Sequence, residues 1–292
     1  MSGLAELLAQ ALDVPAAELE LVPVAGGCVS DARRVSTPGG PLFVKTGPAG
    51  ARSNFEAEAA GLAELRGAHA LRVPQVIAIG ADAEAAFLAL EWIEFGSAGR
   101  ATEQALGERL ATQHRCTAAA YGWDRDNAIG ATPQSNAWSN DWVEFWRARR
   151  LEPQIDLAEQ NGARTPVLDR ARQLAQLLPA YFTSYRPVPS LLHGDLWGGN
   201  WSADADGQPV VFDPAVYYGD READLAMTRL FGGFGTGFYA AYQAAWPLDA
   251  AAGYRRDLYN LYHVLNHYNL FGGGYLEQAA RMIERLLAEL GS

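Results

Sequence analysis

The sequence predicts an α+β fold with two lobes, a small β-rich lobe over residues 1–94 and a larger, mainly helical lobe over residues 95–292. The first observation behind this prediction is the length of 292 residues, which exceeds that of most single domains. The second is a change of pattern along the chain. Short apolar runs separated by Gly and Pro dominate before residue 94, whereas apolar residues at helical spacing dominate after it. We therefore expect a hinge near residues 91–97.

The first lobe is expected to hold a sheet and two helices. One helix is predicted at residues 4–12, and a second at residues 53–66, where Ser53 is a candidate N-cap and Leu62 and Leu65 share an apolar face. The strands are predicted from short apolar runs bounded by glycine and proline turns. They lie at residues 20–24, 32–36, 41–46, 76–79 and 86–93.

The second lobe is expected to be helical around a short β segment. Strand-like runs at residues 191–193 and 209–213 flank a loop that is rich in polar residues and glycine. Apolar residues at helical spacing predict the helices. These cover residues 102–120, 139–152, 167–185 and 255–290, the last one interrupted by glycines at 272–274.

Charge and composition exclude several classes of function. The net charge is −11, with 23 basic against 34 acidic residues, and no basic stripe is present, so we expect no nucleic-acid partner. The acidity suits a cationic small molecule, or serves solubility alone. No apolar run approaches the length that spans a bilayer, and the first residues lack a basic start, so we expect a cytoplasmic protein without a membrane partner. Cys28 and Cys116 have no CxxC neighbour, which argues against a zinc site or a disulfide framework.

The segment HGDLWGGN at residues 193–200, called the polar loop below, carries the strongest chemical signal. Phosphoryl transfer needs a carboxylate that orients the acceptor hydroxyl, oxygen ligands for Mg²⁺ and a cation on the phosphates. Asp195 is the candidate catalytic base, whereas Asn200 and Asp213 are the candidate metal ligands. The competing interpretation is a turn in which Asp195 and Asn200 only satisfy backbone groups.

The first lobe offers candidates for holding a nucleotide. Gly26 and Gly27 could form a turn over phosphates, although a glycine pair between strands is usually a hairpin turn. Lys45 ends an apolar strand and could grip the phosphates, or could be a solvated strand end. Its predicted ion-pair partner is Glu58 on the next helix, with Glu56 as the rival.

Residues around the hinge and the polar loop have two interpretations each. Backbone groups at Glu91 and Ile93 could bond a purine edge, or belong to an ordinary edge strand. Trp197 and Tyr217 could stack on a sugar-like substrate or be core aromatics. Asp224 is expected to cap a helix or to support the loop around Asp195. His193 is expected to be a structural hydrogen bonder beneath Asp195, and not the base.

Taken together, these residues resemble the protein-kinase-like fold in its small-molecule branch, and within it the fructosamine kinase (ketosamine-3-kinase) family. HGD with a following Asn is shared with aminoglycoside and choline kinases, whereas the other matching words are more specific. The words are HGDLWGGN at 193–200, FDPAVYYGDREADLAMTRLFGGF at 212–234, NDWVEFWRARRLEPQID at 140–156, DRDNAIGATPQSN at 124–136 and FEAEAAGL at 55–62.

The resemblance implies an ATP- and Mg²⁺-dependent kinase that phosphorylates the 3-hydroxyl of a ketoamine, either a small molecule or a glycated lysine. The phosphate then destabilises the adduct, so the activity would be deglycation repair. Carried over by motif, Asp195 is the base, and Asn200 and Asp213 hold Mg²⁺. Lys45 meets the phosphates and is held by Glu58, and the backbone at Glu91 and Ile93 meets adenine.

Two positions and two rival functions stay open at this point. Asp220 stands where some family members carry His, and Cys28 lies in the Gly turn, where we expect oxidation to slow the enzyme if the thiol is reactive. One rival function is a kinase for another amine-bearing small molecule, of the aminoglycoside or choline type. The other is a non-catalytic binding module of the same fold.

Overall fold

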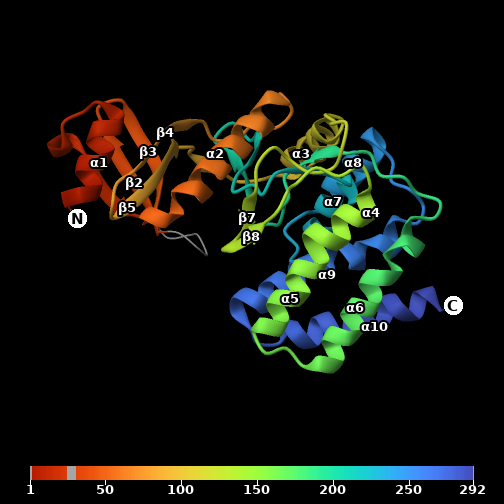
Figure 1. Cartoon of the computed structure of the whole chain (residues 1–292). Helices are drawn as coiled ribbons and strands as arrows, with labels where there is room; N and C mark the ends of the chain where they lie inside the picture. The colour runs from red at the N-terminus through yellow and green to blue at the C-terminus, as the bar shows by residue number, and fades with distance from the viewer. Residues whose placement is uncertain (1, 25–30, 292) are drawn as a thin grey trace.

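The β-rich lobe is built on a five-stranded antiparallel sheet with the strand order β1-β2-β3-β5-β4. The computed structural model describes residues 2–24 and 31–291 (Figure 1). The predicted strands are confirmed with small shifts at their ends. They are β1 (Glu20–Pro23), β2 (Asp31–Thr37), β3 (Gly40–Pro48), β4 (Val76–Ala81) and β5 (Ala85–Glu91).

Both faces of this sheet are covered by helices. Leu8 of α1 (Ser2–Leu12) packs on one face against Phe87 and Ala89. The helix α2 (Arg52–Gly67) packs on the other face, against Leu88 and Leu90. Because successive side chains of a strand point to opposite faces, the unbroken apolar run of β5 is what a strand buried on both sides requires. In Figure 1 the helix α2 lies on the side of the sheet that faces the rest of the chain.

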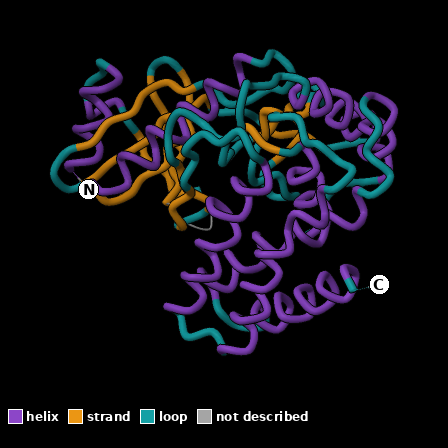
Figure 2. Tube along the Cα trace, turned by 45° about the vertical axis from the view of Figure 1, so that its right-hand side comes forward, coloured by secondary structure: helices purple, strands orange, loops and turns teal. Residues whose placement is uncertain are grey.

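The second lobe is mainly helical, as predicted, and Figure 2 shows helices filling the half of the molecule away from the five-stranded sheet. Its α-helices are α3 (Arg100–His114), α4 (Trp142–Trp146), α5 (Glu152–Gln160), α6 (Thr165–Leu177), α7 (Arg221–Leu230), α8 (Thr236–Ala245), α9 (Ala252–Phe271) and α10 (Tyr275–Leu290). A π-helical turn (Arg147–Leu151) joins α4 to α5. Short 3-10 helices are Ala16–Glu18, Ala49–Ala51 and Leu178–Phe182.

Short strands complete the second lobe and surround the polar loop. They are β6 (Phe95–Gly96), β7 (Asn127–Ile129), β8 (Thr132–Gln134), β9 (Ser190–Leu192), β10 (Trp201–Asp204), β11 (Pro209–Val211) and β12 (Tyr217–Gly219). They pair in the orders β11-β10-β6, β12-β9 and β7-β8. The strand β10 was not predicted, so the loop around Asp195 runs from β9 to β10 and not directly to residue 209.

Several predicted helix boundaries were wrong. The helix predicted at 102–120 ends at His114, because Thr117 and Gly122 form isolated β-bridges with Ser190 and Tyr218. The pattern at 139–152 continues to Gln160, and that at 167–185 is α-helical only to Leu177. Ser53 is not a cap: α2 begins at Arg52, and its N-cap position is Ala51, without a side-chain hydrogen bond. Tertiary pairing overrides local propensity in the first case.

The hinge begins where β5 ends, at Glu91. Arg72 spans the junction here, since its guanidinium pairs with Glu91 at 2.7 Å and also with Asp204 of β10. Its carbonyl accepts a hydrogen bond from the N–H of Val211 at 3.0 Å. The rings of Phe95 and Phe212 contact each other in a tilted arrangement, with centroids 5.5 Å apart. The two lobes are therefore joined by contacts beyond the connecting chain.

One apolar core runs from the α2 side of the sheet into the helical lobe and includes residues on both sides of positions 94 and 95. The division into lobes at that point stays a prediction. Within the described ranges, no helix combines the length and the apolarity that crossing a membrane requires.

Candidate active site

Lys45 is the buried cation at the centre of an ionic cluster. It lies inside β3, which continues to Pro48, so the expectation that Lys45 ends the strand was wrong. Its side chain is 10% exposed, and its Nζ donates to Glu58 Oε1 at 2.7 Å and to Asp213 Oδ1 at 2.6 Å. Burial alone would lower the pKa of Lys45, but the Glu58 and Asp213 carboxylates raise it above its ordinary value. The ammonium is therefore held charged and fixed in place.

The predicted partner of Lys45 is confirmed. Glu58 comes from α2, on the helical face turned to β3, whereas Glu56 pairs with Arg52 at the surface, 2.7 Å away. The contact with Asp213 was not predicted, since it joins the sheet to a loop 168 residues further along the chain.

Asp195 and Asn200 lie together in the loop between β9 and β10. The Nδ2 of Asn200 donates to the carbonyl of Asp195 at 2.8 Å and to its Oδ2 at 3.1 Å. Burial, and next the carboxylate of Asp213, raise the pKa of Asp195 to about 7. Asp195, Asn200 and Asp213 are thus brought together as the sequence predicted, and Asp195 is primed to take up a proton near neutral pH.

The backbone around this loop depends on two unusual conformations. Gly194 has φ +82°, and a Cβ at this position would collide with the carbonyl of Ala215, so only glycine fits. Asp213 has φ +56°, in the left-handed region that non-glycine residues seldom occupy. The close approach of the Ala215 backbone therefore requires glycine at position 194.

His193 links the loop to the segment that carries Asp213. It is fully buried, its Nε2 donates to the carbonyl of Phe212 at 3.0 Å, and its Nδ1 accepts the N–H of Asp195 at 3.3 Å. Burial lowers the pKa of His193, so the ring is neutral and makes one donor and one acceptor contact. It is the structural hydrogen bonder that the sequence predicted.

Asp224 supports the same loop from below. Its Oδ1 accepts the N–H of Gly194 and its Oδ2 the N–H of His193, both at 2.8 Å, and His114 Nε2 lies 3.1 Å from Oδ2. Of the two predicted roles, loop support is present and capping is not, because the N-cap of α7 is Asp220. The contact of His114 with Asp224 was not predicted, since a lone His in a helical pattern does not indicate which residue it binds.

Replacing Asp224 with Asn is expected to reduce the free energy of unfolding by about 1–3 kcal/mol, because an amide N–H would face a backbone N–H in the interior. Denaturant unfolding measures the change. Asp141→Asn is the matched control: Asp141 caps α4 by accepting the N–H of Glu144 at 2.9 Å, and Asn caps equally well. Equal losses of stability in the two variants would contradict the role of Asp224.

Asp220 lies in a buried hydrogen-bond network at the N-terminus of α7. It is fully buried and accepts hydrogen bonds from Tyr259 at 2.5 Å, from Tyr185 at 2.9 Å and from the N–H of Glu222 at 3.0 Å. Glu222 in turn forms a two-pronged pair with the buried Arg255. A direct substrate contact at Asp220 is therefore not supported by its surroundings.

The stability of the protein is expected to depend on pH through Asp220. Burial, and next the Glu222 carboxylate, raise its pKa to about 7 from 3.8. The folded state then binds the proton more tightly than the unfolded state, so this contribution to stability is lost as pH rises from about 4 to about 7. Unfolding at pH 5 and pH 8 should differ less in Asp220→Asn than in the wild type. An unchanged difference would show that Asp220 does not titrate in this range.

The two candidate substrate aromatics differ in exposure. Tyr217 is buried, with Arg150 4.1 Å above its ring and the Phe145 ring 5.8 Å away, so of its two interpretations the core aromatic is the one that the packing supports. Trp197 is partly exposed, covers Gly199 and meets the edge of Phe231 at 6.4 Å. Trp197 stays a candidate for contacting substrate.

The candidate nucleotide contacts are only partly described. Glu91 closes β5, and its side chain is bound to Arg72, while the backbone of Ile93 makes no hydrogen bond with any residue in the described ranges. Gly26, Gly27 and Cys28 lie outside the described residues, so the predicted phosphate turn and thiol stay predictions.

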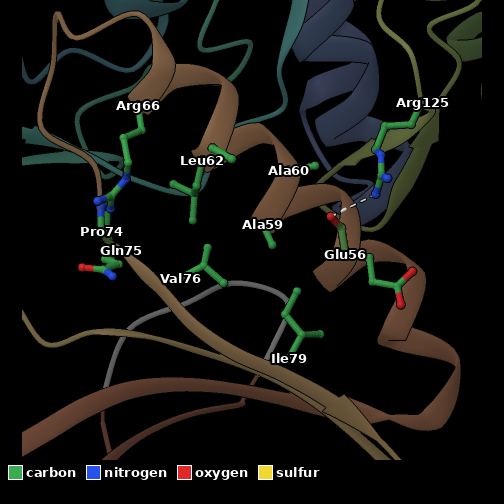
Figure 3. A pocket seen from close by; sticks show the side chains of 11 residues that line it. Glu56, Ala59, Ala60, Leu62, Arg66, Pro74, Gln75, Val76, Ile79 and Arg125 are labelled. Atoms are coloured by element: carbon green, nitrogen blue, oxygen red, sulfur yellow. Dashed lines mark hydrogen bonds between the residues drawn. The ribbon is translucent and has the colours of Figure 1, made fainter.

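A separate groove lies between α2 and β4. Its volume is about 570 Å³, and it is lined mainly by small and apolar residues of these two elements, with Arg66 and Arg125 at its ends (Figure 3). None of the predicted site residues within the described ranges lines it. The cluster around Lys45 is therefore a better candidate active site than this groove.

The donor set between the lobes fits Mg²⁺. The Oδ1 of Asn200 and the Oδ2 of Asp213 make no hydrogen bond with described residues. The other polar atom of each side chain, Asn200 Nδ2 or Asp213 Oδ1, is already hydrogen-bonded. No group of three or more His, Cys, Asp or Glu residues within the described ranges could hold a metal. Two oxygen ligands suffice for Mg²⁺, which keeps waters and binds phosphates as well.

A sheet Lys paired with a helix Glu, facing an Asp and an Asn on a loop across a hinge, defines a kinase of the protein-kinase-like fold, an enzyme that transfers phosphate from ATP to a hydroxyl group. The fold is shared with the aminoglycoside phosphotransferase APH(4)-Ia, with a TM-score of 0.67 at 15% identity over 100% of this chain and 99% of that one.

Within this class, the chain belongs to the fructosamine kinase family, whose family model matches residues 1–289. It is 41% identical to the chloroplastic protein-ribulosamine 3-kinase of Oryza sativa subsp. indica over 91% of this chain and 78% of the relative. A crystal structure from Thermobifida fusca, provisionally described as a fructosamine-3-kinase, matches with a TM-score of 0.86 at 30% identity over 99% of both chains. The resemblance and the fold expected from the sequence are confirmed.

Proposed function

We propose that the protein phosphorylates the 3-hydroxyl of ketosamines, with ATP as the phosphate donor and Mg²⁺ as the metal. The substrate is a ketoamine, in which a sugar group derived from fructose or ribulose is attached to an amine, either a free amine or a protein lysine. The phosphate destabilises the adduct, so the reaction is a step of deglycation repair. A cytoplasmic location stays a prediction from the sequence.

The observation that carries the proposal is the cluster of Lys45, Glu58 and Asp213 next to Asp195 and Asn200, within a chain of this family. These residues come from both lobes, and each has the chemical type that phosphoryl transfer needs. The relatives named as ribulosamine 3-kinases are about 40% identical over most of the chain. This favours ketoamines over aminoglycosides, for which the likeness is one of fold alone.

Each residue has a distinct task in the proposed reaction. Asp195 accepts the proton of the 3-hydroxyl while the oxygen attacks the γ-phosphorus of ATP; the new O–P bond forms as the bond to the ADP oxygen breaks. Lys45 neutralises phosphate charge, and Glu58 keeps its ammonium in place. The backbone at the hinge residues Glu91 and Ile93 is proposed to meet the adenine.

Mg²⁺ would be held by Asn200 and Asp213, and when bound it shields the charge that develops on the phosphate oxygens. Asn200 also keeps Asp195 oriented through its Nδ2, 3.1 Å from Oδ2. Trp197 is proposed to contact the sugar, because it follows Asp195 closely and is partly exposed. Gly26 and Gly27 are proposed to cover the phosphates.

The test is a substrate panel with the purified protein. The ketoamines fructosyl-, ribulosyl- and erythrulosyl-lysine, together with an aminoglycoside and choline, are incubated with MgATP, and ADP release is measured. Phosphorus NMR of the product should place the phosphate on the 3-hydroxyl. Turnover restricted to the aminoglycoside or choline would contradict the proposal, and no turnover of any acceptor would support a binding module instead.

A further inference from the structure

The segment from Phe212 to Val216 carries Asp213 without the support of regular secondary structure. It connects β11 to β12, and its residues Ala215 and Val216 are 2% and 1% exposed. Buried backbone N–H and C=O groups must find partners, so the hydrogen bonds of this segment can be accounted for one by one. The left-handed φ of Asp213 makes this support more important, because such a conformation persists only where the surroundings fix it.

The polar loop supplies partners on one side of the segment. The carbonyl of Phe212 accepts His193 Nε2, and the carbonyl of His193 accepts the N–H of Ala215 at 2.8 Å. The carbonyl of Asn200 accepts the N–H of Phe212 at 3.1 Å. These contacts tie the segment to the candidate catalytic residues.

Two side-chain amides supply partners on the other side. Gln134 Nε2 donates to the carbonyl of Ala215 at 3.3 Å, and Asn127 Nδ2 donates to the carbonyl of Val216 at 2.8 Å. Gln134 Nε2 also donates to Asn127 Oδ1 at 2.8 Å, so the two amides brace each other. They bind the carbonyls two and three residues after Asp213.

The orientation of both amides is itself fixed. Tyr262 donates to Gln134 Oε1 at 2.7 Å, and Asn136 Nδ2 donates to Asn127 Oδ1 at 2.9 Å. Arg150 then donates to Asn136 Oδ1 at 2.6 Å. Arg150 is fully buried and has no carboxylate partner within the described ranges. The hydrogen bond to Asn136 therefore offsets part of the cost of burying its charge. Both amides that face the segment are thus aimed with their N–H groups toward it.

We propose that Asn127 and Gln134 are positioning residues for Asp213: they hold the segment in the conformation in which Asp213 meets both Lys45 and the metal. This inference rests on the proposed function, since it takes Asp213 to be a metal ligand. It also gives a role to two of the matching sequence words, which take no part in the chemistry of the polar loop. DRDNAIGATPQSN contains Asn127 and Gln134, and NDWVEFWRARR contains Arg150.

The experiment measures metal binding directly. Electron paramagnetic resonance follows Mn²⁺ bound to the full-length protein with ADP, and kinetics give kcat and the KM for the ketoamine. In Gln134→Met, the Kd for Mn²⁺ should rise at least about tenfold and kcat should fall by a similar factor, while the KM for the ketoamine stays within about threefold. Asp213→Asn serves as the reference for loss of the metal ligand.

Gln154→Met is the matched control. Gln154 and Gln134 are both 2% exposed, and each has an amide that donates to an Asn Oδ1, but Gln154 binds Asn266 and Asn269 on α9 and not the Asp213 segment. The inference is supported if both variants lose thermal stability to a comparable extent but only Gln134→Met binds Mn²⁺ more weakly. Equal Mn²⁺ affinity in the two variants would overturn it.

Gln134→Glu separates the two contacts of Gln134 and replaces Gln134→Met if that variant does not fold. It keeps the acceptor for Tyr262 and removes the donor to Ala215, so Mn²⁺ binding should be weak here too; wild-type binding would overturn the inference. If the wild type binds Mn²⁺ with ADP but phosphorylates no ketoamine, the proposed substrate is wrong while the positioning result still stands.

Discussion

Replacing Asp195 with Asn is expected to lower kcat by about 10³-fold, with the Kd for MgADP within about threefold of the wild type. The variant keeps the size of the side chain and an oxygen at the position of the carboxylate. It cannot accept the proton of the acceptor hydroxyl, so the loss should fall on the chemical step and not on binding of the nucleotide.

The geometry makes this variant a sharp test. Asn200 Nδ2 lies 3.1 Å from Asp195 Oδ2, so an Asn at position 195 can turn its amide oxygen to the same donor and preserve the loop. Stopped-flow or steady-state ADP release measures kcat, and calorimetry measures MgADP binding. Asp156→Asn is the control, because Asp156 is an exposed carboxylate that faces only Arg172, at 3.5 Å, among the described residues. A fall in kcat of less than about tenfold would show that Asp195 is not the base.

The parts of the site that the sequence predicted are those in which a residue type and a local pattern coincide. Lys45 directly follows the apolar run at residues 42–44, and Glu58 lies on the face of the next helix that turns toward that strand, so each has a reason to face the other. Asp195 and Asn200 lie five residues apart in one loop. Local spacing was enough for both pairs.

The parts that were missed depend on contacts between distant segments. Nothing near Asp213 in the sequence shows that its carboxylate reaches Lys45, or that Gln134 binds the carbonyl of Ala215. Tyr217 offered no local sign of burial, because an aromatic residue beside a polar loop suits either a core or a binding surface; Arg150 and Phe145 settle its packing from a helical segment about 70 residues away.

The same distinction between local patterns and distant contacts explains the errors in the predicted secondary structure. The apolar faces of α2 and β5 are visible as periodic patterns, and these elements were predicted within a few residues. The strand β10 is short, and its pairing with β6 and β11 gives it its identity. The helix α3 stops at His114 because the chain beyond it pairs with β9 and β12, which lie about 70 and 100 residues further along the chain.

Replacing Lys45 with Met is expected to lower kcat/KM for ATP at least about 10²-fold, because the ammonium that would meet the phosphates is lost. It should also destabilise the protein, since Glu58 and Asp213 would lose their shared cation, and Glu58 is only 16% exposed at its side chain. Steady-state kinetics and denaturant unfolding measure the two effects separately.

A second substitution separates stability from activity. When Lys45→Met is combined with Glu58→Gln, one of the two carboxylates that face the introduced methionine becomes a neutral amide and only Asp213 stays charged, so part of the lost stability should return while kcat/KM stays low. Recovery of activity together with stability would mean that Lys45 acts only by supporting the fold, and would contradict its role on the phosphates.

Lys45 is the only lysine in the sequence, so labelling of lysine by an amine-reactive reagent reports on this one side chain. The raised pKa of Lys45 keeps the amine protonated and therefore poorly nucleophilic. Glu58→Gln removes one of the carboxylates that raise the pKa, so Lys45 should be labelled faster in that variant, and MgATP should slow the labelling in both proteins. Faster labelling without protection by MgATP would leave the ion pair in place but would remove Lys45 from the nucleotide site, because a side chain in contact with phosphates cannot stay equally open to the reagent.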